Sequence, residues 1–138
     1  MRFLPRTLPF ILLASSAIAC AQCPVNTVMV KGRVENPPRD SKVRVQLVYA
    51  KDQPGESAET TVENGTFRLP VEFLTQSSRP LLKNLKPKCD RKPLDVIIKL
   101  LEGDQERFEV TLKFAHAFTM PDPTAYTPRS EIVLKGAQ

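Results

Sequence analysis

Few side chains in this sequence of 138 residues are of the kinds that most enzymes use for catalysis. His116 is the only histidine, and it follows Phe114 by two positions. The period of a strand would place both on the inward face, near a strand end. A histidine there is more typical of a structural role than of a catalytic one. A serine triad would need it, yet the sequence lacks a G-x-S-x-G nucleophile motif.

Metal and cofactor sites are disfavoured by the spacing of their usual ligands. In the mature chain, neither Cys23 nor Cys89 has a histidine or cysteine neighbour at the spacing of zinc ligands. The five glycines lie too far apart for a phosphate-binding loop. Two carboxylates would suffice for a glycosidase, but the acidic residues fall mostly on outward strand positions or in loops. We predict no catalytic residue, no cofactor and no metal site, with a small secreted hydrolase as an alternative.

The N-terminal residues have the features of a secretory signal peptide. Two arginines precede a short apolar run, and small residues lie at the cleavage spacing. The run is too short for a membrane span, which needs about 20 residues, and no other stretch is apolar enough to span. We place the cleavage after Ala21, or alternatively after Ala19. Residues 1–21 are then the signal peptide and residues 22–138 form one domain.

The three cysteines suggest two features of an exported protein, a disulfide and a lipid anchor. In an oxidising compartment the two thiols left after cleavage most often pair, which predicts a disulfide between Cys23 and Cys89. The segment Ala17-Ile18-Ala19-Cys20 resembles a bacterial lipoprotein box, although the usual leucine is replaced by Ala17. A lipid on Cys20 would tether the protein to a membrane. Without it, the protein would be secreted, extracellular or periplasmic, and both interpretations stay open.

The charge of the chain is mildly basic. Residues 1–21 hold two of the 20 basic residues and none of the 15 acidic ones, so the mature chain keeps 18 basic and 15 acidic residues, a net charge of +3. The basic residues are scattered, so nucleic-acid binding is not expected. One cluster surrounds Cys89, and it consists of Lys83, Lys86, Lys88, Arg91 and Lys92. It is either a solvated loop or a patch for an anionic partner such as an acidic polysaccharide.

Apolar residues at every second position predict seven strands and no convincing helix. The strands fall within residues 26–35, 42–50, 58–73 (two strands), 93–118 (two strands) and 130–136, whereas residues 51–57 and 119–129 are predicted loops. The strand that contains Val96 is apolar on both faces and should lie centrally. The predicted inward residues are Val28, Val30, Val34, Val43, Val45, Leu47, Tyr49, Phe67, Leu69, Val71, Phe73, Leu94, Val96, Ile98, Leu100, Phe108, Val110, Leu112 and Phe114. This pattern indicates an all-β, about seven-stranded antiparallel sandwich of the immunoglobulin-like or transthyretin-like kind.

The dipeptide Asn64-Gly65 lies between two alternating runs. It predicts a type I′ hairpin turn, because both residues tolerate a positive φ. In a eukaryotic secreted protein, Asn64-Gly65-Thr66 would also be a glycan acceptor, and this question stays open. Pro70 in the following run predicts an edge strand or a bulge.

Three sequence pieces resemble the opening of transthyretin-like and carboxypeptidase-regulatory-like sandwich domains. They are Val30-Lys31-Gly32-Arg33-Val34, Val43-Arg44-Val45-Gln46-Leu47 and Asn64-Gly65-Thr66-Phe67. The resemblance covers about residues 28–73, and the later part of the chain departs from the family pattern. It implies a non-catalytic secreted or surface module that binds a protein or glycan partner. The alternative is a lipid-anchored structural envelope protein.

Overall fold

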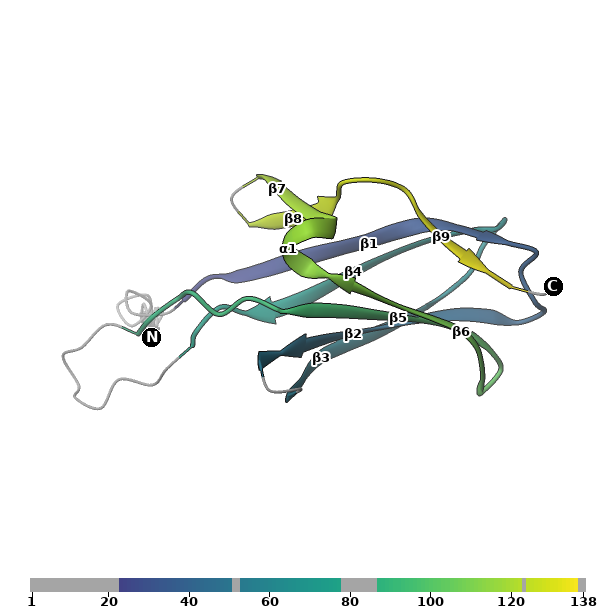
Figure 1. Cartoon of the computed structure of the whole chain (residues 1–138), viewed down its shortest axis with the longest axis horizontal. Coiled ribbons are helices and arrows are strands. Elements are labelled where there is room, and N and C mark those ends of the chain that lie inside the picture. The colour runs from purple at the N-terminus through teal and green to yellow at the C-terminus, as the bar shows by residue number, and fades with distance from the viewer. Residues whose placement is uncertain (1–22, 51–52, 78–86, 123, 137–138) are drawn as a thin grey trace, which may run out of the picture.

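The chain forms two β-sheets that pack face to face. The computed structural model describes residues 23–50, 53–77, 87–122 and 124–136 (Figure 1). Sheet A consists of β1 (Val25–Glu35), β4 (Thr66–Leu74), β7 (Phe118–Asp122), β8 (Ala125–Pro128) and β9 (Ile132–Lys135). Sheet B has the order β3–β2–β5–β6, with β2 (Ser41–Tyr49), β3 (Gln53–Thr61), β5 (Asp95–Glu102) and β6 (Gln105–Lys113). The predicted all-β sandwich is therefore confirmed, with nine strands among the described residues instead of seven.

Sheet A is organised around β1. On one edge β1 pairs with β4 in antiparallel orientation from Val25 to Arg33. On the other edge the first part of β1 pairs with β8 and the last part with β9, both in parallel orientation. The sheets are mostly antiparallel, as predicted, but the parallel pairing at this edge of β1 was not expected. Parallel pairing arises because the chain returns to β1 after crossing from sheet B, so no tight hairpin links the paired strands.

The inward faces of both sheets form one hydrophobic core, as strand alternation predicted. The predicted inward residues of β1, β2 and β4 are all buried, and β5 lies centrally between β2 and β6. Leu94 is an exception, because it precedes β5 and its side chain is 52% exposed. His116 is a second one, since it lies exposed on the one-turn helix α1 (Phe114–Ala117) instead of on an inward strand face. Only Phe114 of that helix is buried.

The Asn64-Gly65 turn has the predicted local geometry but a different role. Asn64 and Gly65 both have positive φ, 53° and 71°. Glu63 and Thr66 exchange two backbone hydrogen bonds across the turn. However, the flanking strands do not form a hairpin, because β3 continues into sheet B and β4 into sheet A. The turn therefore connects the two sheets. Pro70 does lie on an edge strand, since β4 is the outer strand of sheet A.

Two predicted loops contain strands. Residues 53–57 belong to β3, an edge strand whose mostly polar and small side chains lack an apolar alternation. The Pro-containing segment 119–129 includes β8 and most of β7, and these two strands form an antiparallel pair. Backbone pairing stabilises both segments, so hydrophobic periodicity alone did not reveal them. No helix in the described part of the chain is long and apolar enough to cross a membrane.

Candidate functional site

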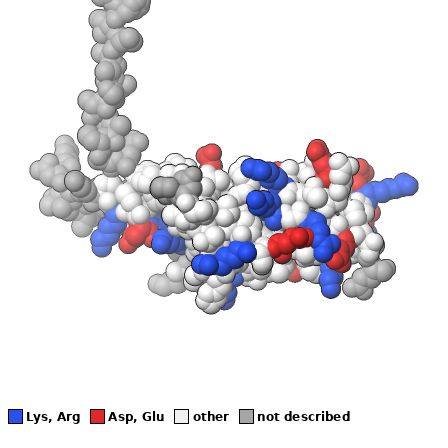
Figure 2. Space-filling model, turned by 90° about the horizontal axis from the view of Figure 1, so that it is seen from above, with Lys and Arg blue, Asp and Glu red and all other residues white. Residues whose placement is uncertain are grey.

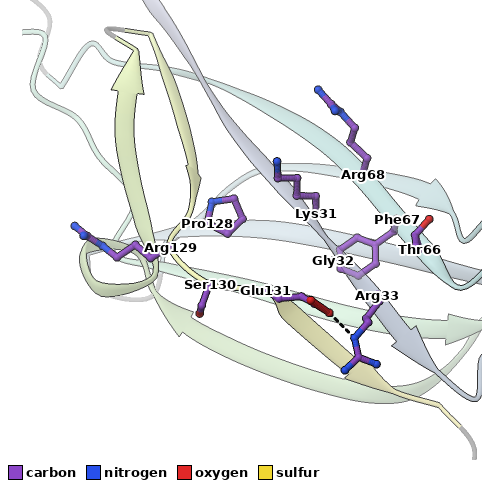
Figure 3. A pocket seen from close by; sticks show the side chains of 10 residues that line it. All are labelled: Lys31, Gly32, Arg33, Thr66, Phe67, Arg68, Pro128, Arg129, Ser130 and Glu131. Carbon is purple, nitrogen blue, oxygen red and sulfur yellow. Dashed lines mark hydrogen bonds and ion pairs between the residues drawn. The ribbon is translucent and has the colours of Figure 1, made fainter.

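A shallow hollow of about 620 Å³ lies on the outward side of sheet A (Figure 3). Three segments line it, namely β1, β4 and the segment that runs from the last residue of β8 to the residue before β9. Its lining residues are Lys31, Gly32, Arg33, Thr66, Phe67, Arg68, Pro128, Arg129, Ser130 and Glu131. Four of these residues are cationic and one is acidic, so the hollow is positively charged.

The cations of the hollow differ in whether a carboxylate forms an ion pair with them. Arg33 forms ion pairs with Glu131 and with Glu35. Within the described residues, Lys31, Arg68 and Arg129 have no ion-pair partner, and all three are exposed. Lys31 and Arg68 are also direct cross-strand partners in the β1–β4 ladder. Like charges at directly opposed positions destabilise a sheet, so this pair is unfavourable unless an anion lies nearby.

The outward face of sheet B shows the opposite arrangement. Its cations Lys42, Arg44 and Lys99 each form an ion pair with a carboxylate on a neighbouring strand. At its margins Arg107 pairs with Glu102, and Lys113 pairs with Asp95. The charges of sheet B therefore neutralise one another locally. Figure 2, which is seen from the side of β7, β8 and β9 of sheet A, shows Lys and Arg side chains across that face with Asp and Glu side chains among them.

The position of β9 explains how the hollow forms. Gly32 lies opposite Ile132, and a Cβ atom at Gly32 would come within 2.0 Å of the Ile132 carbonyl oxygen. Only glycine permits this close approach of two backbones. The backbone N–H of Arg129 donates to the Ala117 carbonyl over 2.8 Å, which fixes the preceding turn. These contacts hold residues 128–131 beside Lys31 and Arg68.

The basic cluster predicted around Cys89 is not part of this hollow. Lys83 and Lys86 lie outside the described residues, whereas Lys88 and Lys92 are exposed at the end of the sandwich that carries the disulfide. Arg91 is engaged within the protein instead of being free for a partner. It donates to a Glu56 carboxylate oxygen and to the Leu74 carbonyl, each over 2.9 Å.

A polar network surrounds Arg91 at this end. The Tyr49 hydroxyl donates to Glu56 over 2.7 Å, and the Leu74 N–H donates to the same carboxylate over 3.1 Å. Burial by itself would raise the pKa of Glu56, but hydrogen bonds from Arg91, Tyr49 and Leu74 outweigh it and lower that pKa. Burial, together with the bond to Glu56, raises the pKa of Tyr49 above its ordinary value. Tyr49, Glu56 and Arg91 all have hydrogen-bond partners inside the protein, so the network supports the fold.

Cys23 and Cys89 form the predicted disulfide, with their Cα atoms 5.3 Å apart. The bridge ties the residues before β1 to the segment that precedes β5. Such disulfides are typical of proteins in oxidising compartments. In the described part of the chain, no three His, Cys, Asp or Glu side chains gather in a way that could hold a metal ion.

No protein-family model matches the chain, and neither a curated protein nor a solved structure shows significant similarity to it. The two-sheet architecture therefore rests on the structure itself. The sequence analysis did not single out Lys31, Arg68 or Arg129. The sequence does show basic residues at outward positions of β1 and β4. That Lys31 and Arg68 are neighbours follows only from the pairing of these two strands, which the sequence does not specify.

Proposed function

We propose that this protein is an exported, non-enzymatic β-sandwich module that binds an anionic partner on the outward face of sheet A. The observation that carries the proposal is the lack of ion-pair partners, within the described residues, for Lys31, Arg68 and Arg129. On sheet B, cations in comparable outward positions are paired. Neighbouring positive charges without acidic partners, present on sheet A and not on sheet B, are expected where a binding partner supplies the negative charge.

Two further features support export. The disulfide between Cys23 and Cys89 suits an oxidising compartment. The N-terminal sequence has the pattern of a signal peptide for residues 1–21, followed by one domain over residues 22–138. The resemblance of residues 28–73 to transthyretin-like and carboxypeptidase-regulatory-like domains supports the same proposal, because such domains are usually non-catalytic modules. A lipid on Cys20 would add a membrane tether without changing the binding face.

The proposal is tested by retention on a sulfated-polysaccharide resin at increasing salt. The test variant carries Lys31→Gln, Arg68→Gln and Arg129→Gln. We expect it to elute at much lower salt than the wild type, because screened attraction to exposed cations supplies the retention. Retention that falls steeply with salt in the wild type is part of the expected result.

A matched control removes the same number of positive charges from the other sheet. This control carries Lys42→Gln, Arg44→Gln and Lys99→Gln, and it should elute close to the wild type. Both variants should keep the circular dichroism spectrum of the wild type, since all six side chains are on the surface. Equal loss of retention in the two variants would show that only net charge matters, and the proposed site would then be wrong.

A further inference from the structure

The positive hollow continues into a second one, and this continuity identifies a class of partner. We infer that the binding face takes a linear acidic polysaccharide that passes over Arg129 and spans both hollows. The inference rests on the proposed function, because the ligand starts from the same face and is the same anionic partner. It adds the chemical nature of the ligand and the requirement that the ligand is long enough to reach both hollows.

Arg129 is the residue that the two hollows share. The second hollow has a volume of about 310 Å³ and is lined by Lys92, Thr119, Met120 and Arg129, among others. It is also lined by Phe114, Phe118 and Tyr126, which are buried, and the ring centroid of Phe114 lies 5.7 Å from that of Phe118 and 4.7 Å from that of Tyr126. The second hollow therefore extends from Arg129, which also lines the first hollow, to a second cation, Lys92.

The directions of the side chains favour an extended ligand over a compact anion. Lys31 and Arg68 project to one side of the sheet, whereas Arg129 points away from both (Figure 3). Arg33 turns instead toward Glu131, with which it pairs. A site for a single sulfate or phosphate needs donors that converge on one point. These cations diverge along the surface, as expected for successive charges of a polymer.

The composition of the face favours a polysaccharide over a protein or a nucleic acid. Protein interfaces concentrate exposed aromatic side chains at their centre, and single-stranded nucleic acids stack their bases on such side chains. All the aromatic side chains that sheet A contributes from the described residues are buried, namely Phe67, Phe73, Phe118 and Tyr126. The first hollow instead offers cations together with Thr66 and Ser130. Cations and hydroxyl groups suit a chain of acidic sugars, which an exported protein would meet outside the cytoplasm.

The test measures binding of size-defined sulfated oligosaccharides by calorimetry, with a tetrasaccharide and a decasaccharide as probes. We expect the decasaccharide to bind at least about tenfold more tightly, because its second contact is made within the same complex. Lys92→Gln should weaken binding of the decasaccharide several-fold and leave the tetrasaccharide unchanged. Lys88→Gln is the matched control, since Lys88 lies on the same segment but lines neither hollow. It should change neither affinity.

The outcomes separate this inference from the proposed function. If Lys92→Gln leaves decasaccharide binding unchanged, the spanning ligand is ruled out. The proposed function still stands in that case, provided that Lys31→Gln with Arg68→Gln weakens tetrasaccharide binding. If polyglutamate binds at the same face more tightly than any oligosaccharide, the partner is an acidic protein and the inference is wrong. If neither polymer binds, both the inference and the proposed function fail.

Discussion

The guanidinium carbon of Arg91 lies 3.6 Å from the centre of the Tyr49 ring. The Gly55 backbone lies against the same ring, because a Cβ atom at Gly55 would come within 2.2 Å of a Tyr49 ring carbon. Arg91 also contacts Glu56 of β3 and the Leu74 carbonyl of β4. One side chain therefore joins sheet B to sheet A at the end that carries the disulfide.

The first prediction concerns this link. Arg91→Ala removes a half-buried ion pair, a hydrogen bond to the Leu74 carbonyl and a cation–π contact. We expect the free energy of unfolding to fall by about 2 kcal/mol, measured by denaturant titration. Arg44→Ala is the control, because its exposed pair with Glu59 should contribute less than about 1 kcal/mol. Equal effects of the two substitutions would show that Arg91 is only a surface charge.

The second prediction concerns acid stability. The pKa of Glu56 lies below its ordinary value of 4.5 in the folded state. A lowered pKa means that ionised Glu56 stabilises the fold above that ordinary value, and that this contribution is lost as the pH falls through the folded-state pKa. The unfolding free energy of the wild type should therefore fall more steeply on acidification than that of Glu56→Gln. Parallel curves for the two proteins would contradict the assignment.

A third prediction tests how β9 is held. Gly32→Ala places a Cβ atom against the Ile132 carbonyl, so β9 should separate from β1. Leu134 is fully buried in that strand, and exposing it should cost at least about 2 kcal/mol of stability. Hydrogen exchange of residues 132–135 should become fast, whereas exchange in sheet B should change little. Gly103→Ala is a useful comparison, since nothing lies within 4 Å of a Cβ atom there and only its positive φ opposes the substitution.

The fourth prediction concerns the acidic residue in the hollow. Glu131→Gln removes the main partner of Arg33 and leaves that cation available to a ligand. Affinity for sulfated oligosaccharides should therefore rise, and its dependence on salt should become steeper. Glu109→Gln removes one charge from sheet B and should leave the affinity nearly unchanged. A similar rise in both variants would attribute the effect to net charge.

The fifth prediction concerns the disulfide, which joins residues 66 positions apart. Replacing Cys23 and Cys89 together by serine releases a long loop in the unfolded chain. In the chain-entropy description this costs about 4 kcal/mol of stability. Thermal denaturation of the double variant, compared with the reduced wild type, should give similar midpoints. A double variant as stable as the oxidised wild type would contradict the expected stabilisation by the bridge.

Sequence periodicity predicted the strands whose side chains alternate between core and solvent. Val43 and Val45 are buried on β2 as expected, because a strand with one face toward the core and one toward solvent alternates apolar and polar residues in the sequence. The Asn64-Gly65 turn was predicted because only a few residue types accept positive φ. These features depend on neighbouring residues, so local sequence is sufficient for them.

The candidate site depends on contacts between distant residues. Lys31 meets Arg68 through the β1–β4 register, and Arg129 joins them because β8 and β9 return to β1. No local pattern encodes which strands become neighbours. The same reason explains why Arg91 was predicted as an exposed basic residue, since its partners Tyr49 and Glu56 lie about 40 residues earlier in the chain.

The parallel pairing of β1 with β9 has a consequence for folding kinetics. The first strand of the domain receives its last neighbour only when residues 132–135 arrive, about 100 residues later. Closing such a long loop costs chain entropy before the native contacts can offset that cost. Proteins with many contacts between distant residues therefore fold slowly. During this delay one edge of β1 remains open to other chains. We therefore expect a chain that ends before Ile132 to aggregate, because the strand that would close this edge is missing.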